Sequence, residues 1–109
     1  MSNSLDTRGV QAVLDLIGGR WKLLILWHLH HGSRRYGELK RLMPSITEKM
    51  LIQQLRELEH DGIVTRTAYA EIPPRVEYAF SEYGKSLLPV LQMLCNWGND
   101  YLDQRLEQS

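Results

Sequence analysis

The chain has 109 residues, of which 43% are hydrophobic and 24% are charged, so it is long enough for one domain with a single core and too short for two. Its longest apolar run, residues 23–27, is far too short to cross a bilayer, and no signal-peptide pattern opens the chain, so we expect a cytoplasmic protein. The 13 basic and 13 acidic residues cancel, which by itself argues against a nucleic-acid partner.

The first third of the chain has helical periodicity. A helix is predicted over residues 8–17, and Gly18-Gly19 then allows a tight corner; no Gly-Lys-Ser/Thr follows, which argues against a phosphate-binding loop. A second helix is predicted over residues 20–31, with Gly32 as the left-handed residue that ends it. Its predicted buried stripe consists of Trp21, Leu24, Ile25 and Leu29.

Two further helices are predicted on either side of a tight turn. The first, short helix covers residues 36–43, with Leu39, Leu42 and Met43 facing inward, and Pro44 ends it. Residues 45–47 form the turn, and a longer helix runs to His60 before Asp61-Gly62. Ser45 and Glu48 match a capping box, but Thr47 is an alternative N-cap, and the sequence leaves this choice open.

The period changes from helical to alternating after Gly62. Residues 63–70 and 76–80 are predicted strands, and two prolines in residues 71–75 place the tip of a hairpin between them. Ser81 is expected to cap a last helix that reaches about Leu106 and is kinked by Pro89. The fold class is therefore mainly α with a small β-hairpin.

This order of elements is that of a winged helix-turn-helix, here predicted over residues 8–106 with flexible ends at residues 1–7 and 107–109. At 100° per residue, the leucines of the helix over residues 47–60 share one face: Leu51, Leu55 and Leu58. The opposite face carries an exposed row of Lys49, Gln53 and Arg56. The helix is therefore predicted to bury its leucines and to present a polar row to a partner.

The polar row has the chemistry for reading base edges in the DNA major groove. Glutamine pairs in a bidentate way with adenine, and lysine or arginine pairs with guanine. Because the N-terminal part of a recognition helix usually makes such contacts, we expect base reading by Thr47, Lys49, Met50 and Gln53. Contacts to the DNA backbone are expected from Arg34, Arg35 and Arg56.

The hairpin supplies a second expected contact. Arg75 follows the two prolines, and a wing arginine is attracted by the negative potential of a narrow minor groove. The alternative is a surface arginine that pairs with Glu77.

The charge distribution supports an anion-binding face. Residues 20–56 contain eight basic and two acidic residues (+6), residues 57–109 sum to −5, and residues 1–19 sum to −1. Two alternatives remain: solvated surface charge without a partner, and a protein-interaction module whose basic face binds an acidic protein rather than DNA.

The first and last helices carry more apolar side chains than one domain core needs. We expect a homodimer interface formed by Val10, Val13, Leu14, Leu91, Leu94, Trp97, Tyr101 and Leu102. A two-fold dimer predicts a pseudo-palindromic operator with half-sites about 34 Å, or a multiple of that, apart. The seam between the subunits is where a small-molecule effector would bind. In the alternative, all of this surface belongs to the core of a monomer.

Catalytic, cofactor and metal sites are not indicated. Of His28, His30 and His31, only the first and last share a side of the helix, and no carboxylate or cysteine completes a metal site. No serine, cysteine or aspartate forms a recognisable catalytic arrangement with a histidine, so we expect neither an enzyme nor a cofactor.

Three ordered motifs resemble the HxlR-type regulators, bacterial and archaeal relatives of the MarR group. The motifs are Ile17-Gly-Gly-Arg-Trp-Lys22, Leu55-Arg-Glu-Leu-Glu59 with Asp61-Gly62, and Pro73-Pro-Arg-Val-Glu-Tyr78. The resemblance covers roughly residues 8–105 and implies a dimeric winged-helix protein that binds double-stranded DNA of the nucleoid and represses or activates neighbouring genes; we expect a repressor.

The chain departs from this family at one position. Redox- and aldehyde-sensing members often carry a Cys-Pro pair just before the first helix, where this chain has Arg8 and Gly9. The single cysteine, Cys95, excludes an intramolecular disulfide and a cysteine-rich zinc site. It lies in an apolar helix, and we expect it to be buried and inert rather than a redox sensor.

Overall fold

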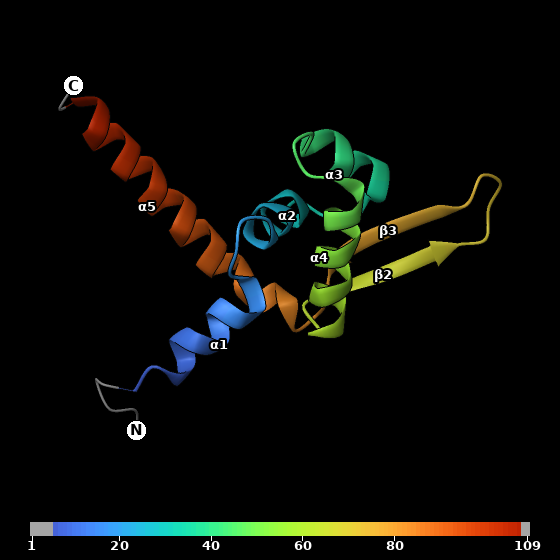
Figure 1. The fold of residues 1–109 in the computed structure, drawn as a ribbon, viewed down its shortest axis with the longest axis horizontal. Helices are drawn as coiled ribbons and strands as arrows, with labels where there is room; N and C mark the ends of the chain where they lie inside the picture. Colours follow the sequence, from blue (N-terminus) through green and yellow to red (C-terminus); the bar gives the residue numbers. More distant parts are fainter. Residues whose placement is uncertain (1–5, 108–109) are drawn as a thin grey trace.

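The computed structural model describes residues 6–107, which form a mainly helical domain with a small antiparallel sheet (Figure 1). The predicted flexible ends lie largely outside the described residues and stay a prediction. In chain order the elements are α1 (Arg8–Ile17), α2 (Lys22–Leu29), β1 (Arg34–Arg35), α3 (Tyr36–Leu42), α4 (Glu48–His60), β2 (Val64–Tyr69), β3 (Arg75–Phe80), the short 3₁₀ helix η1 (Gly84–Leu87) and α5 (Leu88–Glu107). The predicted winged helix-turn-helix is confirmed, with α3 and α4 as the two helices around the turn.

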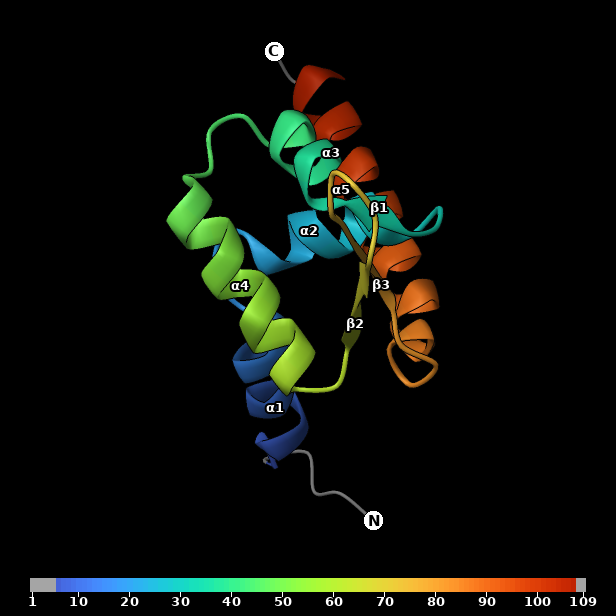
Figure 2. The same cartoon turned by 90° about the vertical axis from the view of Figure 1, so that its right-hand side faces the viewer.

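The wing is part of a three-stranded sheet in the order β1-β3-β2 (Figure 2). Strands β2 and β3 pair antiparallel from Val64 opposite Phe80 to Tyr69 opposite Arg75. Strand β1 pairs with the other edge of β3 and was not predicted. It contains only two residues, which is too short to show an alternating pattern.

The core lies between α2, α3, α4 and the base of the wing. The three predicted leucines of α4, Leu51, Leu55 and Leu58, are each at most 1% exposed. On β3, Tyr78 and Phe80 are two residues apart and therefore lie on the same face of the sheet, where both are buried.

Two leucines that were predicted to be buried are exposed instead, Leu24 at 45% and Leu42 at 43%. Helix α2 is apolar on nearly all sides, so periodicity does not identify its buried face, and Leu26 takes the core position. Helix α3 ends at Leu42, so Met43 leaves the helix and packs inward on its own.

The structure decides how α4 begins. Thr47 has extended backbone angles, and its Oγ1 accepts a hydrogen bond from the backbone N–H of Met50 at 3.1 Å. This is N-cap geometry, so Thr47 is the cap and Ser45 belongs to the preceding turn.

The entry to α5 differs from the prediction. The Ser81 hydroxyl donates to the carbonyl of Gly62 at 2.6 Å and accepts from the N–H of Gly84 at 2.8 Å, so it caps η1 rather than the long helix. Pro89 is the second residue of α5, in the first turn, where its missing N–H removes no helical bond. The predicted kink inside the helix is therefore wrong.

Gly84 is required by a close approach of two backbone segments. A Cβ atom at this position would lie 2.1 Å from the carbonyl oxygen of Ile63. We expect Gly84→Ala to lower the free energy of unfolding by about 1–3 kcal/mol, measured by urea denaturation. Gly9→Ala is the matched control, because a Cβ there meets nothing within 4 Å, and it should be neutral or stabilising. Equal stabilities of the two variants would contradict this packing.

Helices α1 and α5 project from the body on the side away from the wing (Figure 1). Each contributes a single buried apolar residue to the core, Ile17 in α1 and Leu91 in α5. Most of their apolar surface therefore lies outside the domain core. Among the described helices, none is long and apolar enough to pass through a membrane.

Candidate nucleic-acid interface

The outward face of α4 carries the predicted polar row. Lys49, Gln53 and Arg56 are all exposed, on the side of the helix opposite its buried leucines. Of the other two predicted base-reading residues, Thr47 is exposed but its oxygen is engaged as the N-cap, and Met50 is half-buried. Of the four predicted base-reading residues, Lys49 and Gln53 are therefore the two with long exposed polar side chains that can reach a groove of DNA.

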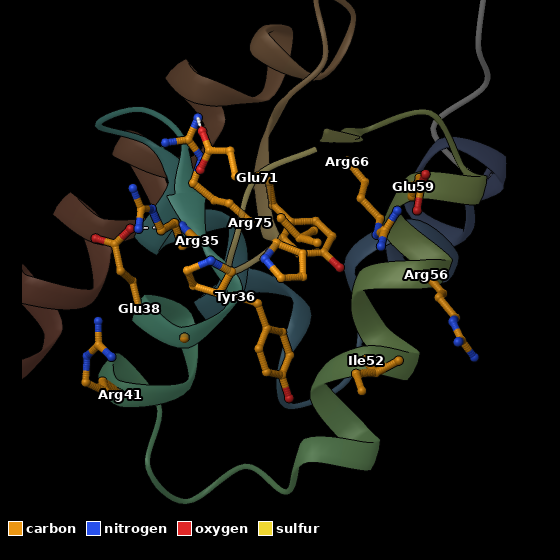
Figure 3. A pocket seen from close by; sticks show the side chains of 15 residues that line it. Arg35, Tyr36, Glu38, Arg41, Ile52, Arg56, Glu59, Arg66, Glu71 and Arg75 are labelled. Carbon is orange, nitrogen blue, oxygen red and sulfur yellow. Dashed lines mark hydrogen bonds and ion pairs between the residues drawn. The ribbon is translucent and has the colours of Figure 1, made fainter. Parts of the chain in front are cut away.

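A groove of about 880 Å³ separates the wing from α3 and α4 (Figure 3). Arg35 and Arg41 line one side, and Arg56 and Arg66 line the other. Arg75 and three glutamates, Glu38, Glu59 and Glu71, complete the charged lining. With five arginines against three carboxylates, the groove has the sign of charge that attracts phosphate.

Arg41 and Arg66 are groove residues that the sequence analysis did not assign. Arg41 lies on α3 and Arg66 on β2, so only the packing of the wing against the helix-turn-helix brings them together. Little in the sequence singled them out, since exposed arginines are common on helices and strands.

Tyr36 also lines this groove, between α3 and α4 (Figure 3). Its hydroxyl is buried and has no hydrogen-bond partner among the described residues. Burial, together with the nearby Glu48 and Tyr78, raises the pKa of this phenol, so it stays protonated and remains a hydrogen-bond donor.

The two adjacent arginines of β1 have different surroundings. The Arg34 Nε donates to the carbonyl oxygen of His28 at 2.9 Å, and its guanidinium lies 3.9 Å from the Glu38 carboxylate. Arg35 is exposed and lines the groove, while its backbone N–H donates to Glu38 at 2.9 Å and thereby caps α3. The position of Arg35 suits a backbone contact, whereas Arg34 joins β1 to the end of α2.

Arg75 does not lie at the tip of the wing, contrary to expectation. It is the first residue of β3; its guanidinium stacks on the Tyr69 ring at 4.0 Å and lies 3.3 Å from Glu71 and 3.8 Å from Glu77. The structure thus shows the alternative pairing with Glu77. The tip itself is residues 71–74, where Ile72 is fully exposed.

Seven of the eight predicted dimer residues are exposed, by 47–69%: Val10, Val13, Leu14, Leu94, Trp97, Tyr101 and Leu102. The alternative that all of this surface belongs to the monomer core is wrong for these seven. Leu91, in contrast, is only 4% exposed, because it lies in the part of α5 that still packs on the body. Its assignment to a dimer interface is therefore corrected.

Comparison with known proteins gives consistent results. A family model described as HxlR-like helix-turn-helix matches residues 16–106. The chain is 58% identical over 95 residues to the uncharacterized HTH-type transcriptional regulator YtcD of Bacillus subtilis, an alignment that covers 87% of this chain and 75% of that protein. It is 52% identical over 96 residues to YkvN, another uncharacterized HTH-type transcriptional regulator of that organism, covering 88% and 81%.

A solved structure is similar to this chain as well. The redox regulator HypR in its reduced form superposes with a TM-score of 0.85 at 44% identity, covering 93% of this chain and 99% of HypR.

Proposed function

This chain belongs to the HxlR-like helix-turn-helix family of DNA-binding transcription regulators, and from that premise we propose that it represses neighbouring genes by binding a pseudo-palindromic operator as a homodimer. It acts by binding rather than catalysis, on the DNA of the nucleoid in the cytoplasm. The observation that carries the proposal is the exposed row of Lys49 and Gln53 on a helix whose other face is fully buried.

In this proposal α4 enters the major groove. Gln53 forms the bidentate pair with adenine and Lys49 contacts guanine, while Thr47 and Met50 shape the approach at the start of the helix. Arg56 lies one turn further along α4 and lines the arginine groove. It therefore contacts phosphate.

The DNA backbone lies along the groove between the wing and α3. Arg35, Arg41 and Arg66 contact phosphates there. Arg75, neutralised by Glu71 and Glu77, supports the wing and reaches the minor groove only if those ion pairs open. The tip residues 71–74 are the part of the wing that approaches the minor groove.

Dimerisation buries the apolar surfaces of α1 and α5. A two-fold axis between two copies of α5 covers Leu94, Trp97 and Tyr101, and it places the two α4 helices for half-sites about 34 Å, or a multiple of that, apart. A small-molecule effector would bind at this seam.

A salt titration separates DNA binding from binding to an acidic protein. For binding to a random duplex, the logarithm of the association constant should fall linearly with the logarithm of salt concentration, by about 0.9 for each phosphate neutralised. Four arginines per subunit, Arg35, Arg41, Arg56 and Arg66, predict a slope of about −7 for a dimer. Absence of binding to duplex DNA at low salt would contradict the proposal and leave the protein-interaction module as the function.

A further inference from the structure

Lys22 is the one charged residue buried among residues 6–107. Its side chain is 7% exposed, and its Nζ lies 2.9 Å from Oε1 of Glu57, which is 43% exposed. Removing a lysine from water is costly unless a partner compensates, and a buried pair of this kind adds little to stability compared with apolar residues of the same size. The pair therefore points to a role other than stability.

The ion pair joins two parts of the molecule that matter for DNA binding. Lys22 is the first residue of α2, directly after the bend from α1, which carries part of the proposed dimer surface. Glu57 lies on the outward side of α4, one helical turn after Gln53. Asp15, Lys22, Lys49, Gln53 and Glu57 all line one pocket of about 720 Å³ between α1, α2 and α4.

Glu57 would be an unfavourable residue on this face if it were unpaired. A carboxylate beside base-reading side chains repels the phosphates of DNA. The hydrogen bond from Lys22 is the main cause that lowers the pKa of Glu57, so this carboxylate stays charged. Glu57 is thus an acceptor held by Lys22 one helical turn after Gln53, in the same pocket, where the Gln53 amide can reach it.

This arrangement orients the Gln53 amide. An amide that donates one N–H to a carboxylate keeps its oxygen and its second N–H for another partner. These are the two groups that pair with the edge of adenine. A carboxylate that is itself held by Lys22 therefore fixes both which way the amide faces and the rotamer of the side chain.

We propose that Lys22 is a positioning residue for base reading: through its 2.9 Å ion pair with Glu57 it holds the outward face of α4, and the Gln53 side chain on it, in the pose that distinguishes one base from another. The inference rests on the proposed function, because it assigns a role in that same site. It concerns specificity, so it predicts a loss of preference between sequences rather than a loss of binding to all of them.

The test compares Lys22→Met, which keeps the length of the side chain, and Glu57→Gln, which keeps the shape of the partner. Dissociation constants are measured at one salt concentration for a duplex selected by the wild-type protein and for a random duplex, with a thermal melt of each variant. In both variants we expect the preference for the selected duplex to fall about tenfold, while binding to the random duplex changes by less than about threefold. The double variant should lose no more preference than either single variant, because both act through one pair.

Lys85→Met is the matched control, since it removes another lysine–glutamate pair outside α4, between Lys85 on η1 and Glu82 just before η1, at 2.8 Å. It should keep the wild-type preference. If Lys22→Met does not fold, Glu57→Gln decides the question, because Glu57 is partly exposed. If Glu57→Gln kept the wild-type preference, or if its affinity for both duplexes fell equally, this inference would be overturned and the proposed function would stand. A wild-type protein that selects no sequence would overturn the proposed function as well.

Discussion

Replacing both Leu94 and Trp97 by aspartate should convert the protein into a monomer and weaken operator binding by about 10²–10⁴-fold. The two side chains are 49% and 69% exposed on the projecting part of α5, and four carboxylates at a two-fold seam would repel one another. A dimer gains affinity because binding of the first half-site makes binding of the second intramolecular, and a monomer loses that gain. Analytical ultracentrifugation gives the oligomeric state, and fluorescence anisotropy gives the affinity.

Asn96→Asp is the control for the added charge. Asn96 is on the same exposed stretch of α5, about 200° around the helix from Leu94, so it should leave the dimer intact. The monomeric double variant should still fold, with one cooperative thermal transition, because neither side chain belongs to the core. A double variant that remains a dimer, or a monomer that binds the operator as tightly as the wild type, would contradict the proposed interface.

Reversing the charge of two groove arginines is expected to have the second largest effect. Arg41→Glu combined with Arg66→Glu should weaken binding to every duplex by about 10²–10³-fold, because each subunit loses two charge-assisted phosphate contacts. The slope of log K against log salt should become shallower by about 3–4 for the dimer. The measurement is a salt titration with both a selected and a random duplex.

Lys85→Glu is the control, since it reverses a cation outside the groove on η1. It should change the affinity by less than about threefold. If the double reversal weakened only the selected duplex, or left the salt slope unchanged, the DNA backbone would not lie in this groove.

The helix-turn-helix could be predicted from the sequence because its signals are local. The spacing of Leu51, Leu55 and Leu58 identified the buried face of α4, and Gly62 marked the change to strands; both features are present in the structure. The wing was predicted because two adjacent prolines interrupt an alternating pattern.

Features that depend on tertiary contacts could not be predicted in the same way. Strand β1 exists only because two residues pair with the edge of β3, and Arg41 and Arg66 meet only when the wing packs against α3 and α4. Leu91 and Leu94 look alike in the sequence, as two leucines in the same apolar helix. Leu91 is buried and Leu94 is exposed because α5 leaves the body between them.

The contacts of a charged side chain are also hard to predict from the sequence, as Arg75 shows. Its position beside two prolines predicted a free side chain at the wing tip, but Tyr69 is directly opposite it in the β2–β3 ladder and offers its ring. Glu71 and Glu77 then complete its surroundings. The cross-strand register that creates this contact is not encoded in any short motif.

Selection of bound duplexes from a random library shows whether Gln53 and Lys49 on α4 read the DNA sequence. For the wild type we expect two symmetric half-sites, and for Gln53→Ala we expect the loss of preference at one base position in each half-site, by about 1–3 kcal/mol. Gln54→Ala, whose side chain contacts Met50 on the neighbouring side of the helix, should select the wild-type sequence. An unenriched library, or the same base preference with and without Gln53, would show that this face of α4 does not read the DNA sequence.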